Sequence, residues 1–347
     1  MATRNCFAWS LAFSTVLCYG LPMLAQSATL VHEKEDIAKA KVAIEHKNYS
    51  TALKILKPMA EQQGLRPAQY HLGLMYLDGQ GVAQDPKKAA ELFKKAADQG
   101  GKHAAYNLGL LYAQGHGVKQ DFNKAFEQFK KVADEGEADA QYNVGLLYLS
   151  GQGTKQDSEE AAKYFGLAAD QGHVYAQYNK ALMYLDDKEK SDKSEAFKIL
   201  QKLANSGFVP AQGNLGLMYL HGDSVPKDNK IAANWIAKAA KNGSLEAQYN
   251  LGVMYHNGAG VPKDEKQSIS WLQKAAHGGY ADAQFNVGLQ YEKGNFEPKD
   301  EKLAKQWFKK AADQGDKEAK QKLASLSREA RTKTVSQVTP VHGAIAR

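Results

Sequence analysis

Two side-chain types recur together along this 347-residue chain: an asparagine, and directly before it a position that is usually aromatic. The asparagines are Asn107, Asn143, Asn179, Asn214, Asn250 and Asn286. The aromatic residues are Tyr70, Tyr106, Tyr142, Tyr178, Tyr249 and Phe285, with Gly213 as an exception and His71 standing after Tyr70. A side-chain amide both donates and accepts hydrogen bonds, so it can hold an extended peptide backbone through two contacts. The two columns are therefore candidates for a partner-binding surface.

A structural role is the alternative for the same residues. They belong to a phrase that the chain repeats, and residues 140–148, Ala-Gln-Tyr-Asn-Val-Gly-Leu-Leu-Tyr, are one copy of it. Repeated units are held together mainly by contacts with their nearest neighbours. The sequence leaves open whether the asparagines and tyrosines read a peptide or brace neighbouring repeats.

No other group of residues is spaced for catalysis or metal binding. The histidines are scattered, and the sequence has no nucleophile elbow, phosphate-binding glycine loop or His-Glu-x-x-His pair. Glycine pairs such as Gly79-Gln80-Gly81 lie between two predicted helices, where they form turns. We therefore predict a protein that is not an enzyme and that has no catalytic residues, metal site or cofactor.

The phrase that carries the two columns occurs seven times. Its anchor residues are 36 positions apart, with one step of 35, and they are Gly73, Gly109, Gly145, Ala181, Gly216, Gly252 and Gly288. A period of this length indicates a solenoid, because each small unit must pack on its neighbours to bury a core. The repeat therefore predicts one elongated domain rather than several globular ones.

Each unit reads as two helices, and residues 137–172 serve as the example. Ala138 to Leu149 is predicted to be a buried helix, and the glycines of the following loop end it. Asp157 is the expected N-cap of a second helix over residues 158–170, with Glu160 completing a capping box. The unit is thus predicted to be a helical hairpin.

Three further columns support this interpretation. The expected caps are Asp85, Asp121, Asp157, Asp192, Asp228, Asp264 and Asp300. Four residues later stand Ala89, Ala125, Ala161, Ala196, Ala232, Ser268 and Ala304, which allow the two helices to approach closely. The core between them is expected to be filled by Phe93, Phe129, Phe165, Leu200, Ile236, Leu272 and Phe308.

The combined pattern resembles the Sel1-like repeat, a relative of the tetratricopeptide repeat. It consists of Ala-x-Tyr-Asn-Leu-Gly-x-x-Tyr, then Gly-x-Gly-Val, a capping Asp and Lys-Ala-Ala-x-x-Gly. The resemblance implies an all-α fold, an α/α superhelical solenoid of helical hairpins. The seven repeats are placed at 65–100, 101–136, 137–172, 173–207, 208–243, 244–279 and 280–315. Residues 28–64 are expected to form an N-terminal capping hairpin of tetratricopeptide type, 316–330 a C-terminal capping helix and 331–347 a flexible tail.

The first 27 residues are predicted to be a cleaved signal peptide. Arg4 precedes an apolar stretch, and Ala25-Gln26-Ser27 offers small residues at a cleavage site. A membrane anchor is the alternative, although the stretch is short and polar for a stable span. Both cysteines, Cys6 and Cys18, lie in this leader, so the mature chain is expected to have no disulfide. We therefore expect an exported protein, periplasmic or secreted, without stable membrane insertion after cleavage.

The net charge of +7 comes from lysines that alternate with acidic residues, as around Lys94-Lys95. This pattern is typical of a solvated helix face, and it does not predict nucleic-acid binding. Weak attraction to acidic envelope polymers or lipid surfaces stays open. Trp235, Trp271 and Trp307 are also 36 apart and are expected to pack between hairpins.

The resemblance implies a function in protein–protein interaction. In tetratricopeptide-like proteins the first helices line a concave face where peptides bind, so this chain is expected to be a non-enzymatic scaffold or adaptor of the bacterial envelope. Two alternatives are a secreted, host-facing virulence factor that aids entry or trafficking, and a cell-wall-active enzyme. The irregular repeat 173–207, with its Asp186 to Lys190 loop, is either a decayed copy, a hinge or a binding site.

Overall fold

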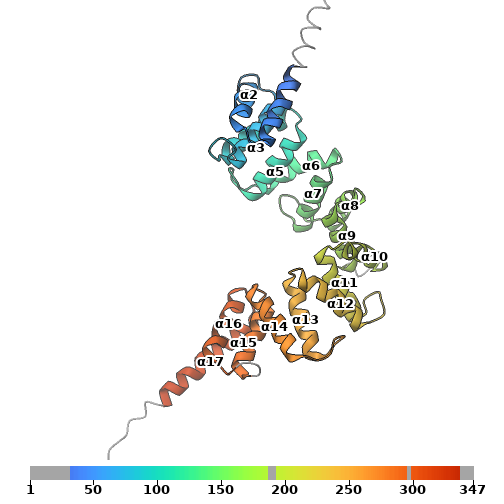
Figure 1. Ribbon diagram of the computed structural model, residues 1–347, viewed down its shortest axis with the longest axis vertical. Coiled ribbons are helices and arrows are strands. Elements are labelled where there is room, and N and C mark those ends of the chain that lie inside the picture. Colours follow the sequence, from blue (N-terminus) through green and yellow to red (C-terminus); the bar gives the residue numbers. More distant parts are fainter. Residues whose placement is uncertain (1–31, 187–192, 295–297, 337–347) are drawn as a thin grey trace, which may run out of the picture. The chain divides into compact units, whose positions relative to one another are not determined.

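The structure is a computed structural model that describes residues 32–186, 193–294 and 298–336. Within these ranges every regular element is a helix (Figure 1). The chain divides into two compact units, one ending at Ala176 and the other beginning at Gln177. The proposed signal peptide lies outside the described residues. No described helix is long and apolar enough to cross a membrane.

The first unit begins with a helix over residues 32–45 and continues with regular hairpins. Its helices are α2 (Tyr49–Glu61), α3 (Arg66–Asp78), α4 (Pro86–Asp98), α5 (Lys102–Gln114), α6 (Phe122–Asp134), α7 (Ala138–Ser150) and α8 (Ser158–Asp170). The boundary of the two units falls within α9 (Val174–Asp186). The helices predicted over 138–149 and 158–170 are confirmed by α7 and α8.

The second unit has the same alternation of first and second helices. It contains α10 (Lys193–Asn205), α11 (Val209–His221), α12 (Asn229–Lys241), α13 (Leu245–Asn257), α14 (Glu265–His277), α15 (Ala281–Lys293), α16 (Glu301–Asp313) and α17 (Lys317–Ser336). The last helix continues past residue 330, where the sequence had placed the start of a flexible tail, and residues 337–347 lie outside the described part. Residues 187–190 of the irregular loop are also outside it.

The predicted aspartate caps form at six second helices. Asp157 Oδ1, for example, accepts the backbone N–H groups of Glu159 and Glu160, both at 3.0 Å. The others are Asp85, Asp121, Asp228, Asp264 and Asp300, whereas Asp192 lies outside the described residues. These caps satisfy backbone donors that have no partner within the helix.

The predicted capping box at Glu160 is wrong. The Asp157 N–H that Glu160 would have accepted donates instead to the carbonyl oxygen of Tyr148, at 2.9 Å, in the preceding helix. The Glu160 carboxylate pairs with Lys163 at 3.1 Å. The tight turn between the two helices therefore satisfies the donor that a capping box would otherwise need.

The core of each hairpin depends on close approach of the first helix to a large side chain of the second. Phe165 is fully buried, and a β-carbon added to Gly145 would lie 2.7 Å from its ring. Such a contact is too short for any side chain, so this position requires glycine. The predicted core residues Phe93, Phe129 and Phe308 are buried in the same way.

A ladder of hydrogen-bonded glutamines joins successive repeats. It was not predicted from the sequence. Gln141, only 4% exposed, donates to the carbonyl of Ala133 at 3.3 Å and accepts from Gln171 at 2.8 Å. Gln171 also donates to the carbonyl of Gly136 at 2.9 Å. The same arrangement recurs at Gln69 with Gln99 and at Gln284 with Gln314. These hydrogen bonds satisfy polar groups that would otherwise be buried without a partner.

Candidate peptide-binding face

The asparagine and tyrosine columns lie on the first helices and are joined from one repeat to the next. The amide nitrogen of four of the asparagines donates to the hydroxyl of the tyrosine in the preceding repeat. The pairs are Asn107 with Tyr70 (3.5 Å), Asn143 with Tyr106 (3.1 Å), Asn214 with Tyr178 (2.6 Å) and Asn286 with Tyr249 (3.2 Å). The bracing contact that the sequence left as an alternative is therefore present at these four seams.

Bracing uses up part of the hydrogen-bonding capacity of the asparagines. Asn143 and Asn286 each donate a second bond to the carbonyl four residues earlier, at 2.9 Å, so both of their N–H groups are occupied. Their side-chain oxygens accept no hydrogen bond from the described residues. A peptide backbone would therefore meet acceptors at these two positions. The role of the column in peptide binding stays a prediction.

The aromatic column is half-buried and rests on the hairpin core. The ring of Tyr106 lies 5.5 Å from that of Phe129, and the ring of Phe285 lies 5.6 Å from that of Phe308. Burial raises the pKa of Tyr106, Tyr178 and Tyr249 above the ordinary value for tyrosine. These side chains are only partly buried, so the column is part of the surface as well as of the seam.

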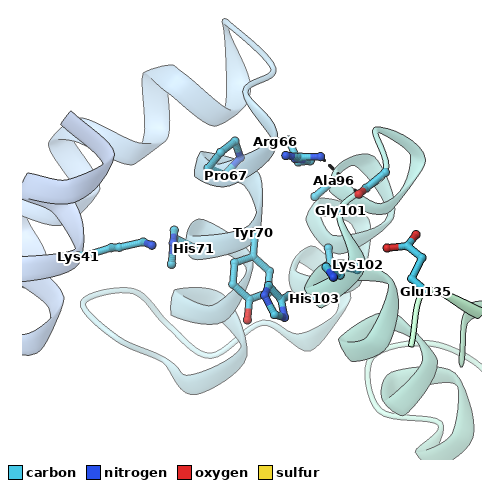
Figure 2. Close-up of a pocket in the computed structure, with 12 residues that line it drawn as sticks. Lys41, Arg66, Pro67, Tyr70, His71, Ala96, Gly101, Lys102, His103 and Glu135 are labelled. Carbon is cyan, nitrogen blue, oxygen red and sulfur yellow. Dashed lines mark hydrogen bonds between the residues drawn. The ribbon is translucent and has the colours of Figure 1, made fainter. Parts of the chain in front are cut away.

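A cleft of about 580 Å³ opens on this face between α3 and α5 in the first unit. Figure 2 shows Lys41, Arg66 and Lys102 among the side chains around Tyr70. The cleft is lined by Lys41, Arg66, Pro67, Tyr70, His71, Ala96, Gly100, Gly101, Lys102, His103, Ala104 and Glu135. Three cationic side chains and one carboxylate thus line it, which gives it a net positive charge.

The cations of this cleft are held in different ways. Arg66 Nη1 donates to the carbonyls of Gln99 and Gly100, both at 3.3 Å, which fixes the guanidinium at the rim. Lys102 Nζ lies 2.6 Å from Glu137. Lys41, on the helix over residues 32–45, is exposed and forms no ion pair with the described residues. Arg66 and Lys41 therefore contribute positive charge without forming an ion pair among the described residues, and Glu135 is the one carboxylate that lines the cleft.

His71 lies beside these groups as a neutral side chain. Burial lowers its pKa to about 4, and the positive charge of Lys41 acts in the same direction. Its ring lies 5.2 Å from the ring of Tyr70, edge to face. The histidine therefore adds no charge to the cleft at neutral pH.

The second unit has a cleft of about 450 Å³ at the equivalent seam, between α11 and α13. The residues that line it include Tyr178, Pro210, Gly213, Asn214, Leu217, Ile236, Glu246 and Asn250. Glu246 is the one charged residue among those that line it. The two clefts therefore occupy the same place in the repeat but carry opposite charge.

The sequence reading named the columns but missed the residues that make these two seams different. Lys41, Arg66, Lys102 and Glu246 gave no signal because they stand on four different helices, which only packing places beside the clefts. A usable signal existed in the breaks of the columns, since His71 replaces asparagine at one seam and Gly213 replaces tyrosine at the other. Both clefts coincide with such a break. Among the described residues no group of three His, Cys, Asp or Glu side chains is arranged to hold a metal ion.

Comparison with known proteins identifies the repeat. The family model of the Sel1 repeat matches seven consecutive segments, 66–101, 102–137, 138–173, 174–208, 209–244, 245–280 and 281–316. Each match begins one residue after the start derived from the sequence pattern. Comparison with curated proteins gives no match.

Two solved structures are similar to most of the chain. A Sel1 repeat protein from Oxalobacter formigenes is 30% identical, with a TM-score of 0.68, over 94% of this chain and 97% of that one. A protective antigen of uropathogenic Escherichia coli that displays an SLR fold is 29% identical, with a TM-score of 0.69, over 89% of this chain and 68% of that one. With seven matched repeats, this chain belongs to the Sel1 repeat family, an all-α fold typical of scaffolds for protein–protein interaction.

Proposed function

We propose that this protein is an exported, non-enzymatic scaffold of the bacterial envelope that binds an acidic polypeptide segment in the cleft between α3 and α5. The observation that carries the proposal is the excess of positive charge around an open cleft on the face of the first helices. Charge of one sign that lines a cleft attracts and orients ligands of the opposite sign. The Sel1 repeat fold supports the assignment as a protein-binding scaffold.

The structure also favours an extended segment as the ligand. The cleft is bounded by first helices of successive repeats, and the side-chain oxygen of Asn143 in the next repeat is free to accept a backbone N–H. Aromatic surface at Tyr70 lies between the cationic groups. Acidic side chains of the ligand would meet Lys41 and Arg66, and apolar ones would meet the ring.

The test compares binding of two labelled decapeptides, one alternating glutamate with glycine and one alternating lysine with glycine. We expect the acidic peptide to bind in a salt-sensitive manner and the basic one not to bind. Lys41→Glu should weaken the binding of the acidic peptide by about five- to tenfold, as measured by fluorescence anisotropy. Lys41 is exposed and makes no ion pair with described residues, so the variant should keep its fold.

A matched control separates the cleft from the general charge of the protein. Lys54→Glu changes the net charge equally but lies on α2, outside the residues that line the cleft. It should leave acidic-peptide binding within about twofold. Equal losses in both variants, or no binding of the acidic peptide at low salt, would refute the cleft as the binding site.

Export is the second part of the proposal, and the leader residues support it. The mature chain is expected to begin near Ala28 and to be found outside the cytoplasm. N-terminal sequencing of the native protein, together with cell fractionation, tests this. Recovery of an intact Met1 or Ala2 would contradict it.

A host-facing role is the second candidate function, favoured by the similarity to the protective antigen of uropathogenic E. coli. In that case the protein would be secreted or exposed on the cell surface. Protease treatment of intact cells distinguishes the two, because a periplasmic scaffold is protected and a surface protein is cleaved. The binding experiment above applies to both.

A further inference from the structure

Two ring positions are vacant at the seam between α11 and α13. In the seam before it, the ring of Tyr178 lies 5.4 Å from that of Phe208. In the seam after it, the rings of Tyr249 and Tyr280 lie 5.4 Å apart. The corresponding residues here are Gly213 and Ser244, neither of which has a ring. The second cleft lies at this place.

The space left by Gly213 is open. A β-carbon built on Gly213 would meet no atom within 4 Å, unlike one on Gly216 in the next turn, which would lie 2.6 Å from Ile236. Ile236, Leu217 and Pro210 line the cleft with apolar surface. Ile236 stands where Phe129 supports the ring of Tyr106 in an ordinary repeat. An aromatic side chain in the cleft would therefore pack against apolar residues that are already in place.

The hydrogen-bond donor that an ordinary repeat supplies to a tyrosine hydroxyl is also present and unused. Asn214 and Asn286 donate to the hydroxyls of Tyr178 and Tyr249, at 2.6 and 3.2 Å. Asn250 would donate to residue 213, which is glycine, and it forms no side-chain hydrogen bond within the described part of the chain. Asn250 lines the cleft.

The charge of the cleft selects among aromatic ligands. Glu246 is its one charged lining residue and is exposed to solvent. A basic residue beside the aromatic ring would therefore meet an opposite charge. Residues 337–347 contain no Tyr, Phe or Trp, so these residues do not supply the ring.

We propose that the cleft between α11 and α13 receives a tyrosine side chain of a partner polypeptide, with a lysine or arginine next to it. The phenol ring replaces the one missing at Gly213, its hydroxyl accepts from Asn250 Nδ2, and the neighbouring cation pairs with Glu246. This inference deepens the proposed scaffold function and rests on it in one respect, namely that the face of the first helices binds polypeptide.

The probe is the acetylated, amidated tripeptide Lys-Tyr-Lys, titrated into the isotopically labelled full-length protein and followed by NMR. We expect saturable shifts of the backbone amide of Gly213 and the side-chain amide of Asn250. Lys-Phe-Lys should bind about fivefold more weakly, since it lacks the hydroxyl. Glu-Tyr-Glu should also bind more weakly, because its charges face Glu246.

The decisive variant fills the cleft with the ring that other repeats carry. Gly213→Tyr should reduce tripeptide binding at least tenfold, whereas Gly213→Ala, which leaves the cleft open, should keep it. Ser244→Tyr is a second blocking variant, because Tyr280 already occupies the equivalent N-cap position of α15. Asn250→Ala should abolish the difference in affinity between Lys-Tyr-Lys and Lys-Phe-Lys.

The outcomes distinguish this inference from the proposed function of the first cleft. Lys41→Glu should not change the affinity for the tripeptide Lys-Tyr-Lys, and Gly213→Tyr should not change the affinity for the acidic decapeptide. Absence of saturable shifts at Gly213, or equal binding by the two folded blocking variants and the unaltered protein, would overturn the tyrosine site. Failure of the acidic peptide alone would refute only the first cleft.

Discussion

Single residues in this protein differ from their repeat column in ways that are expected to change stability. A repeated position gives its own internal control, because the same structural environment occurs several times with another residue. Ser268 and His71 are two such departures. Ser268 is the serine in a column of alanines, and His71 is the histidine in a column of asparagines.

Ser268→Ala is expected to increase the free energy of unfolding by about 1 kcal/mol. Ser268 is fully buried, and its hydroxyl has no hydrogen-bond partner among the described residues. An unsatisfied buried hydroxyl is destabilising relative to a methyl group of similar size. Denaturant unfolding of the variant measures the change.

The matched control for this prediction is Ala232→Ser, the reverse change at the equivalent position of the preceding repeat, which is also fully buried. It should lower the free energy of unfolding by a similar amount. A loss of stability in Ser268→Ala would show that the hydroxyl has a partner in solution.

His71 is expected to make stability depend on pH. Its folded pKa of about 4 lies below the ordinary 6.5, so the unfolded chain binds the proton more readily. The stability contributed by neutral His71 is complete above pH 6.5 and is lost as the pH falls from 6.5 towards 4. The loss should be about 1–2 kcal/mol, since the partly exposed ring is screened by solvent.

The control for this pH dependence is His71→Asn, which restores the residue of the other repeats. Its free energy of unfolding should change less than that of the unaltered protein between pH 6.5 and 4. The measurement is denaturant unfolding at a series of pH values. An unchanged profile in the variant would assign the effect to other groups.

At the scale of the elements, helix ends are governed by one aspartate and by the turn before it. The first helix of six hairpins ends in a glycine with positive φ, as at Gly151, and the loop then returns to a capping aspartate. The backbone N–H of that aspartate is bonded to the preceding helix, for example from Asp157 to Tyr148. The cap and the interhelical turn thus form one hydrogen-bonded unit.

Asp157→Ala should lower the free energy of unfolding by about 1 kcal/mol, because two backbone donors of α8 lose their acceptor. Glu160→Ala is the control and should change it by at most a few tenths of a kcal/mol, since Glu160 forms only an exposed pair with Lys163. Equal losses of stability in the two variants would show that Glu160 also caps α8, as the capping-box prediction states. Thermal and denaturant unfolding both measure these changes.

At the scale of the whole molecule, the buried side chains form several separate clusters instead of one core. Phe129 and Val144 belong to a cluster of the first unit, whereas Phe308 and Ala319 belong to one of the second. Each repeat contacts its sequence neighbours, so a local defect is expected to have local consequences.

Phe129→Ala should accelerate amide hydrogen exchange in α5, α6 and α7 far more than in α14, α15 and α16. The cavity removes about 3–5 kcal/mol of local packing energy. Phe308→Ala is the matched variant and should give the opposite distribution. Uniform acceleration along the chain in either variant would show that the protein unfolds as one cooperative unit.

The sequence by itself determined the all-α repeat, the positions of the helices and the aspartate caps. These depend on short-range signals, such as apolar periodicity over one helix, a glycine that ends it and an aspartate that begins the next. The signals at Asp157 and Gly151 act within a few residues of their own position. The helix boundaries at α7 and α8 were therefore predictable.

Only the tertiary structure showed which contacts the recurring polar residues make within the protein. Asn143 could read a peptide or brace a seam, and its hydrogen bond to Tyr106 depends on how two successive repeats pack. The glutamine ladder and the gathering of Lys41 with Lys102 at one cleft likewise depend on packing between helices that are distant in sequence. Such contacts depend on which side chains neighbouring helices bring together. A local residue pattern specifies a helix, but it does not specify which side chains of other helices will contact it.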